Sequence, residues 1–86
     1  MANNTSIFTK NGMTHYVFYG VPVVVFNDVA IILNTENHFT KTTKHRINQA
    51  SKEYDLGFKV IQKNKEWLVD YKGKLLSFVD GMTLER

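Results

Sequence analysis

The sequence contains no cysteine and a single proline. No disulfide can therefore hold this chain together, and a composition without cysteine fits a reducing compartment. The first twenty residues lack the basic segment followed by an apolar segment that marks an export signal. The longest apolar stretch is interrupted at Asn27-Asp28 and is too short to cross a bilayer. These absences predict a cytoplasmic protein that does not enter a membrane.

The residue patterns of common catalytic and metal sites are missing as well. The three histidines, His15, His38 and His45, lie far apart and match none of the usual zinc-ligand spacings. No phosphate-binding glycine loop is present, and most carboxylates fall in expected turns or on polar strand faces. We therefore expect no enzymatic activity, no metal and no cofactor.

What the sequence does contain is enough apolar material for one core. Of its 86 residues, 43% are hydrophobic and 13% are aromatic, which argues against disorder. No repeat, linker or low-complexity segment divides the chain. We expect a single domain over residues 1–86, with a flexible tail at 1–5 and a frayed end at 82–86.

Turn residues in the first half indicate two β-hairpins. Asn11-Gly12 separates two segments rich in strand-forming residues, 6–10 and 13–19, and predicts a type I′ turn with positive φ at both positions. Segments 23–26 and 29–33 predict a second hairpin around Asn27-Asp28. Its strands are apolar on both faces, which is typical of strands covered on both sides.

A helical pattern follows the polar connector at 34–39. Thr43, Ile47, Ala50 and Tyr54 recur at helical spacing and predict a helix at about residues 41–55. Thr40 or Thr42 can provide the N-cap, and Gly57 can end the helix in a left-handed conformation.

Alternation with a period of two returns after Gly57. Strands are expected around 58–63, 66–71 and 75–79, separated by turns at Asn64-Lys65 and 72–74. The expected order is ββββαβββ, an α+β fold with a mainly antiparallel sheet of about six to seven short strands and one packed helix. An alternative that the pattern leaves open is a sheet curled into a partial barrel.

The net charge of +3 is concentrated in the second half of the chain. Residues 1–40 hold one lysine against two carboxylates, whereas residues 41–86 hold ten Lys and Arg against six Asp and Glu. The polar side of the expected helix, flanked by Arg46, could contact phosphate or a partner, or it could be an ordinary solvated face. The candidate residues are Lys41, Lys44, His45, Arg46, Asn48 and Lys52.

Aromatic residues supply a second group of candidates. They could form a protein interface or stack on bases, but they could equally be core residues. The candidates are Tyr16, Phe18, Tyr19, Trp67 and Tyr71.

Four short segments resemble a family of small bacteriophage-encoded proteins of unknown function: Tyr19-Gly20-Val21-Pro22, residues 42–48, Glu66-Trp67-Leu68-Val69 and Asp80-Gly81-Met82. The resemblance covers most of the chain and implies expression inside an infected bacterium. The family has no assigned activity, so no functional residue is carried over. Small phage accessory proteins often act by occupying host or phage macromolecules, an argument from class alone.

Two functions follow as expectations. The first is a non-enzymatic phage accessory protein that binds and modulates a protein partner, such as a host or defence factor. The alternative is a nucleic-acid-binding module that contacts DNA or RNA through the basic helix face. Since one helix cannot cover both faces of the apolar strands, we also expect a homodimer formed through the sheet, unless the sheet closes on itself.

Overall fold

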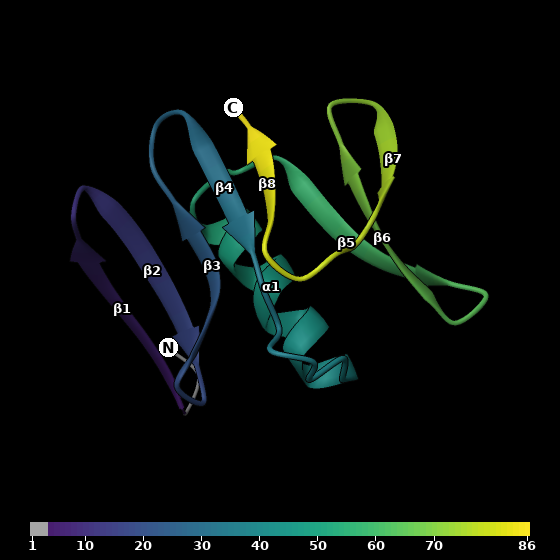
Figure 1. The fold of residues 1–86 in the computed structure, drawn as a ribbon, viewed down its shortest axis with the longest axis horizontal. Coiled ribbons are helices and arrows are strands. Elements are labelled where there is room, and N and C mark those ends of the chain that lie inside the picture. Colours follow the sequence, from purple (N-terminus) through teal and green to yellow (C-terminus); the bar gives the residue numbers. More distant parts are fainter. Residues whose placement is uncertain (1–3) are drawn as a thin grey trace.

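The computed structural model describes residues 4–86, which form eight strands and one helix (Figure 1). The α+β class, the antiparallel pairing and the single helix expected from the sequence are confirmed. The elements, in chain order, are β1 (Thr5–Lys10), β2 (Met13–Phe18), β3 (Val21–Phe26), β4 (Ala30–Leu33), α1 (Lys41–Glu53), β5 (Phe58–Lys63), β6 (Glu66–Tyr71), β7 (Lys74–Ser77) and β8 (Met82–Glu85).

The strands divide between two antiparallel sheets. A five-stranded sheet has the order β1-β2-β3-β4-β8, and a three-stranded sheet has the order β5-β6-β7. Helix α1 lies behind the larger sheet in Figure 1, and the smaller sheet stands to one side of both. The partial barrel left open by the sequence does not form in residues 4–86, because the strands pair as two separate sheets.

Tight two-residue turns connect most of the hairpins. Asn11 and Gly12 have φ values of 53° and 76°, which confirms the type I′ turn expected there. Three further turns join paired strands in the same way, with positive φ at both central residues: Tyr19-Gly20, Asn64-Lys65 and Lys72-Gly73.

The C-terminal end and the first described residues are more regular than the sequence suggested. The expected frayed end at 82–86 is wrong, because β8 pairs with the outer edge of β4, with Ala30 opposite Glu85, and buries Leu84. Of the expected flexible tail at 1–5, residues 1–3 lie outside the described residues, whereas Thr5 begins β1 and pairs with Phe18. The sequence missed β8 because four residues show too little alternation to reveal a strand.

The helix begins as expected and ends two residues early. Thr40 is the N-cap, and its hydroxyl accepts a hydrogen bond from the Thr43 amide. The helix stops at Glu53 because Asp55, not Gly57, takes the first left-handed conformation, with φ of 52°. The Leu56 amide then donates to the Ser51 carbonyl, the closing bond of a Schellman motif. In residues 4–86 no helix is both long and apolar enough to cross a membrane.

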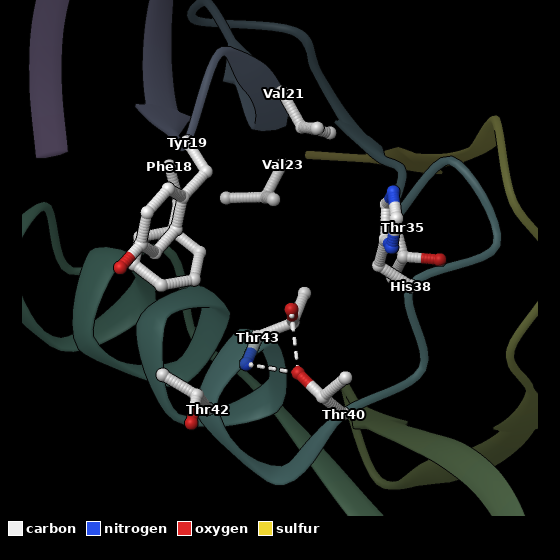
Figure 2. A pocket seen from close by; sticks show the side chains of 9 residues that line it. All are labelled: Phe18, Tyr19, Val21, Val23, Thr35, His38, Thr40, Thr42 and Thr43. Atoms are coloured by element: carbon white, nitrogen blue, oxygen red, sulfur yellow. Dashed lines mark hydrogen bonds between the residues drawn. The ribbon is translucent and has the colours of Figure 1, made fainter. Parts of the chain in front are cut away.

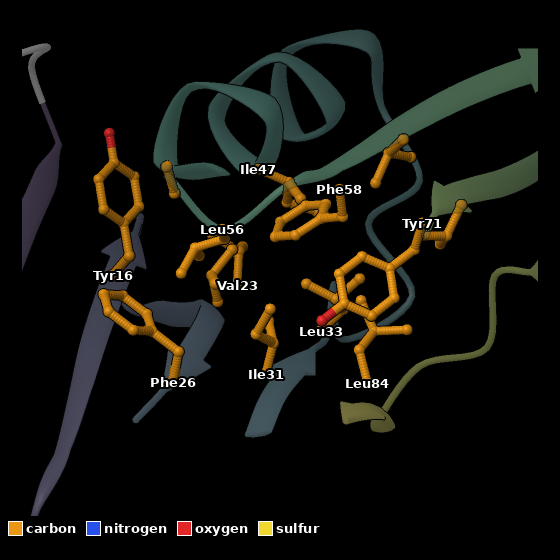
Figure 3. Close-up of a cluster of buried hydrophobic side chains, with 14 of the residues drawn as sticks. Tyr16, Val23, Phe26, Ile31, Leu33, Ile47, Leu56, Phe58, Tyr71 and Leu84 are labelled. Carbon is orange, nitrogen blue, oxygen red and sulfur yellow. The ribbon is translucent and has the colours of Figure 1, made fainter. Parts of the chain in front are cut away.

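The hydrophobic core lies where α1 packs between the two sheets (Figure 3). Ile47 and Ala50 of the helix are fully buried, as their helical spacing predicted. The large sheet contributes Val24, Ile31 and Leu33, all without exposed surface. Tyr71 of β6 is buried as well, and its hydroxyl donates to the Glu85 carbonyl of β8, which ties the two sheets together.

The helix also covers the edge of the smaller sheet. Asn48 donates through Nδ2 to the Val60 carbonyl at 2.8 Å and accepts at Oδ1 from the Val60 amide at 2.7 Å. Ser51 repeats this pattern through its hydroxyl, which donates to the Phe58 carbonyl and accepts from the Phe58 amide. These side chains take the place of a neighbouring strand beside β5, so that edge exposes fewer unpaired backbone groups.

Candidate functional site

A cavity of about 370 Å³ opens beside the first turn of α1 (Figure 2). One wall comes from the end of β2, the turn that follows it and the start of β3. The other wall comes from the segment between β4 and α1 and from the helix start. The lining residues are Phe18, Tyr19, Val21, Val23, Thr35, His38, Thr40, Thr42 and Thr43.

The first wall is apolar and carries an exposed aromatic ring. Phe18 and Val23 are buried, whereas Tyr19 has 68% of its surface exposed. The type I′ turn at Tyr19-Gly20 places this ring beside Phe18, with the ring centroids 4.7 Å apart in an edge-to-face arrangement. Arg46 lies over the Phe18 ring, with its guanidinium carbon 5.6 Å from the centroid. The wall therefore offers aromatic and aliphatic contact to an incoming apolar group.

The second wall is lined by hydroxyl groups and by the positive end of the helix. The Thr40 and Thr43 hydroxyl oxygens lie 2.9 Å apart, and the first intrahelical bond runs from the Lys44 amide to the Thr40 carbonyl. The amides of Lys41 and Thr42 precede this bond, and no acidic residue occupies the first turn. This wall can therefore donate hydrogen bonds to an acceptor on a bound molecule.

Asp80 holds the second wall in position from the other end of the chain. Its carboxylate accepts hydrogen bonds from the Thr35 amide at 2.8 Å, from the Thr35 hydroxyl at 2.8 and 2.9 Å, and from the Asn37 amide at 2.9 Å. Thr35 has no exposed surface, so this carboxylate replaces water for a buried amide and hydroxyl. The loop before α1 is thereby fixed to the connection between β7 and β8.

The helix candidates do not form a single free face. Lys41, His45 and Lys52 are exposed and Lys44 is partly buried. By contrast, the side-chain amide of Asn48 is hydrogen-bonded to the backbone of Val60. Arg46 lies over the Phe18 ring and donates a hydrogen bond to the Gln49 side chain at 2.8 Å. Two of the six candidates thus have structural contacts that helical periodicity does not reveal, because Val60 lies on β5 and Phe18 on β2.

The lysines of α1 continue onto the outward face of β5. In residues 4–86, hydrogen bonds from cationic side chains come from Arg46, Lys72 and Arg86, and they end on amide or carbonyl oxygens rather than on carboxylates. We call the remaining lysines of these two elements the basic strip: Lys41, Lys44, Lys52, Lys59 and Lys63.

Most aromatic candidates belong to the core. Tyr16 is fully buried, and burial, with a smaller contribution from Glu53, raises the pKa of its hydroxyl. Phe18 and Tyr71 are buried too, so Tyr16, Phe18 and Tyr71 are not exposed interface residues, and Phe18 reaches a partner only as part of the cavity wall. Tyr19 alone of the five is mostly exposed.

Trp67 lies between these extremes. It is partly buried in an edge-to-face cluster, with ring centroids 5.1 Å from Phe39 and 5.4 Å from Phe78. The cluster borders a second cavity of about 420 Å³ that Gln62 and Lys65 also line. Sequence reasoning did not include Phe39 or Phe78 among the candidates. It placed Phe78 in an expected strand at 75–79, but β7 ends at Ser77 and Phe78 lies in the connection that follows.

Residues 4–86 contain no group of three or more His, Asp or Glu side chains placed to hold a metal ion. Neither curated proteins nor solved structures give a match to the chain.

A protein-family model does match, and it covers residues 1–85. The chain is thus a bacteriophage protein, which confirms the resemblance noted in its short segments. It belongs to the Kyanoviridae Gp96 protein family.

Proposed function

We propose that this phage protein acts without catalysis, by binding and modulating a protein partner, a host or defence factor, in the host cytoplasm. The observation that supports this function is Tyr19, which is 68% exposed at the rim of the cavity beside α1. Tyrosine is enriched at protein interfaces, and interface energy concentrates where an anchoring side chain fills a pocket. The lack of cysteine is consistent with a reducing cytoplasm.

The two walls of the cavity define the chemistry of the expected anchor. Phe18, Val21 and Val23 favour an aliphatic or aromatic side chain. The threonine hydroxyls and His38 on the opposite wall can pair with backbone amide or carbonyl groups on either side of that side chain. An apolar anchor carried on a peptide backbone satisfies both walls at once.

Replacing Tyr19 with asparagine tests this proposal. Asparagine tolerates the positive φ of 51° at this position, so the turn is retained while the aromatic ring is lost. In pull-downs from infected host lysate, we expect a partner enriched by the unaltered protein to fall at least about tenfold, the typical effect of removing a central aromatic contact.

The matched control is V29N, which changes an exposed apolar residue in a different turn to the same side chain. This variant is expected to retain the partner. Equal recovery by Y19N and the unaltered protein, or no protein enriched above background by either, would reject the proposed site.

Nucleic-acid binding is the second candidate function, and the basic strip favours it. Its five lysines form no hydrogen bond to a carboxylate within residues 4–86, so their charges are available to an anionic partner. Trp67 and Lys65 beside the second cavity add an aromatic ring and a further cation. Such combinations of lysines and aromatic rings are typical of single-strand binders.

A gel-shift series across ionic strength tests this candidate with duplex DNA, single-stranded DNA and RNA. With three phosphate contacts, affinity between about 50 and 200 mM salt should fall roughly 40-fold for duplex DNA and roughly 20-fold for single strands, because bound counterions are released. The triple variant K41Q/K44Q/K52Q should abolish the shift, whereas K72Q/K74Q at another turn should retain it. Absence of binding to all three nucleic acids at low salt excludes this function.

A further inference from the structure

The second face of the five-stranded sheet is not covered by any helix or strand of residues 4–86 (Figure 1). Helix α1 packs on the face that includes Tyr16, Val24 and Leu33. The strand register places five residues of the opposite face in one row, one from each strand. We call them the open face: Phe8, His15, Val25, Ile32 and Thr83.

The open face is apolar along its middle. Phe8 is 46% exposed and stacks in parallel on His15, with ring centroids 4.7 Å apart and an angle of 8° between the planes. Val25 on the central strand β3 and Ile32 on the neighbouring strand β4 are partly exposed. Because apolar area in water is unfavourable, and strands apolar on both faces are usually covered on both, this row indicates a surface that is buried in use.

We propose that the open face binds a second copy of this chain, face to face, about a two-fold axis parallel to the strands. This rotation lays β3 over the partner's β3 and lays β1 over the partner's β8. Phe8 then meets the partner's Thr83, and His15 meets the partner's Ile32. The large residues on the β1 side of one copy thus face smaller residues on the β8 side of the partner. Two sheets about 10 Å apart pack closely when large and small side chains oppose each other in this way.

Charge selects this axis from the alternatives. Lys10 and Glu85 lie in one row at the same end of the open face, since Lys10 pairs with Met13 and Ala30 pairs with Glu85. They stand on opposite edges, four strand spacings or about 19 Å apart within one copy. The proposed rotation brings each Lys10 to the partner's Glu85, whereas a two-fold axis across the strands does not.

The area of the face is sufficient for a specific dimer. Five strands, about 4.8 Å apart and up to about 20 Å long, present on the order of 450 Å² in flat projection per copy. Corrugated side chains add to this, so two copies reach the roughly 1,000 Å² that specific interfaces need. In this dimer, the two cavities and the basic strip of each copy face outward. The proposed dimer does not depend on the proposed function.

Charge reversal combined with sedimentation tests the interface. The unaltered protein should sediment at about 20 kDa at micromolar concentration, twice the chain mass of 10.0 kDa. K10E and E85K should each raise the dimer dissociation constant about tenfold, since each replaces two attractive pairs with two repulsive ones. The combined variant K10E/E85K should restore dimerisation, which contact within one copy cannot explain across that distance.

A second pair of variants tests the apolar row. I32E places a charge beside the centre of the open face and should give a folded monomer, whereas L75E on the exposed side of β7 should stay dimeric. Circular dichroism verifies that the variants fold. If I32E does not fold, the variants K10E, E85K and K10E/E85K still test the interface. A single 10.0 kDa species for the unaltered protein, or dimerisation unchanged by both K10E and E85K, overturns the proposal.

Discussion

Replacing Asp80 with alanine is expected to lower the free energy of unfolding by about 3 kcal/mol, because buried groups then lose a charged acceptor. The carboxylate accepts bonds from the Thr35 amide, the Thr35 hydroxyl and the Asn37 amide at 2.8 to 2.9 Å. Thr35 is completely buried, so water cannot replace the lost acceptor without opening the loop. Urea titration followed by the fluorescence of Trp67, the single tryptophan, measures the loss.

Two further variants separate this role from a general effect of charge. D28A removes a carboxylate from an exposed turn and should change stability by less than about 0.5 kcal/mol. D80N keeps the shape of the side chain but converts one accepting oxygen to an NH₂ group, so its loss should fall between the other two. A loss below about 1 kcal/mol for D80A would show that Thr35 and Asn37 find other partners.

Asn48→Leu is expected to cost about 3 kcal/mol, although leucine is the better helix former. The asparagine amide pairs with both the carbonyl and the amide of Val60, which is 1% exposed. Leucine leaves both backbone groups buried without partners and opens the contact between α1 and β5. Urea titration measures the cost, and hydrogen exchange should show lost protection of the Val60 amide.

The matched control for this variant is H45L on the same helix. His45 is exposed, so the same replacement there should change stability by less than about 0.5 kcal/mol. N48D should be intermediate, since its carboxylate still accepts from the Val60 amide but faces the Val60 carbonyl oxygen without a donor. Equal stability of N48L and H45L would mean that Asn48 does not hold the helix to β5.

Local chemistry explains what could be predicted of the candidate sites. Tyr19 was identified as an aromatic candidate, and Lys41, Lys44 and Lys52 as helix cations, because residue type and helical spacing are visible in the sequence. The cavity itself was not predicted, since its walls come from β2, β3 and the segment before α1. Those segments meet only after the strands have paired and α1 has packed on them.

The sequence by itself determined the features that depend on neighbouring residues. Asn11-Gly12 specifies a type I′ turn because both residues accept positive φ, and Thr40 caps α1 because its hydroxyl reaches the amide three residues on. The spacing of Ile47 and Ala50 defined the buried side of the helix, since residues three and four apart share one face.

Only the tertiary structure decided which polar residues are structural. In the sequence, Asn48 has the pattern of a solvent-facing helix residue, but in the fold β5 brings Val60 beside its amide. Asp80 has the pattern of a turn residue, but in the fold it lies within hydrogen-bond distance of Thr35, which is 45 positions away. β8 likewise exists because β4 offers an unpaired edge. Burial and hydrogen bonding between residues so far apart in the sequence depend on the tertiary arrangement of the whole chain. The local residue pattern does not encode that arrangement.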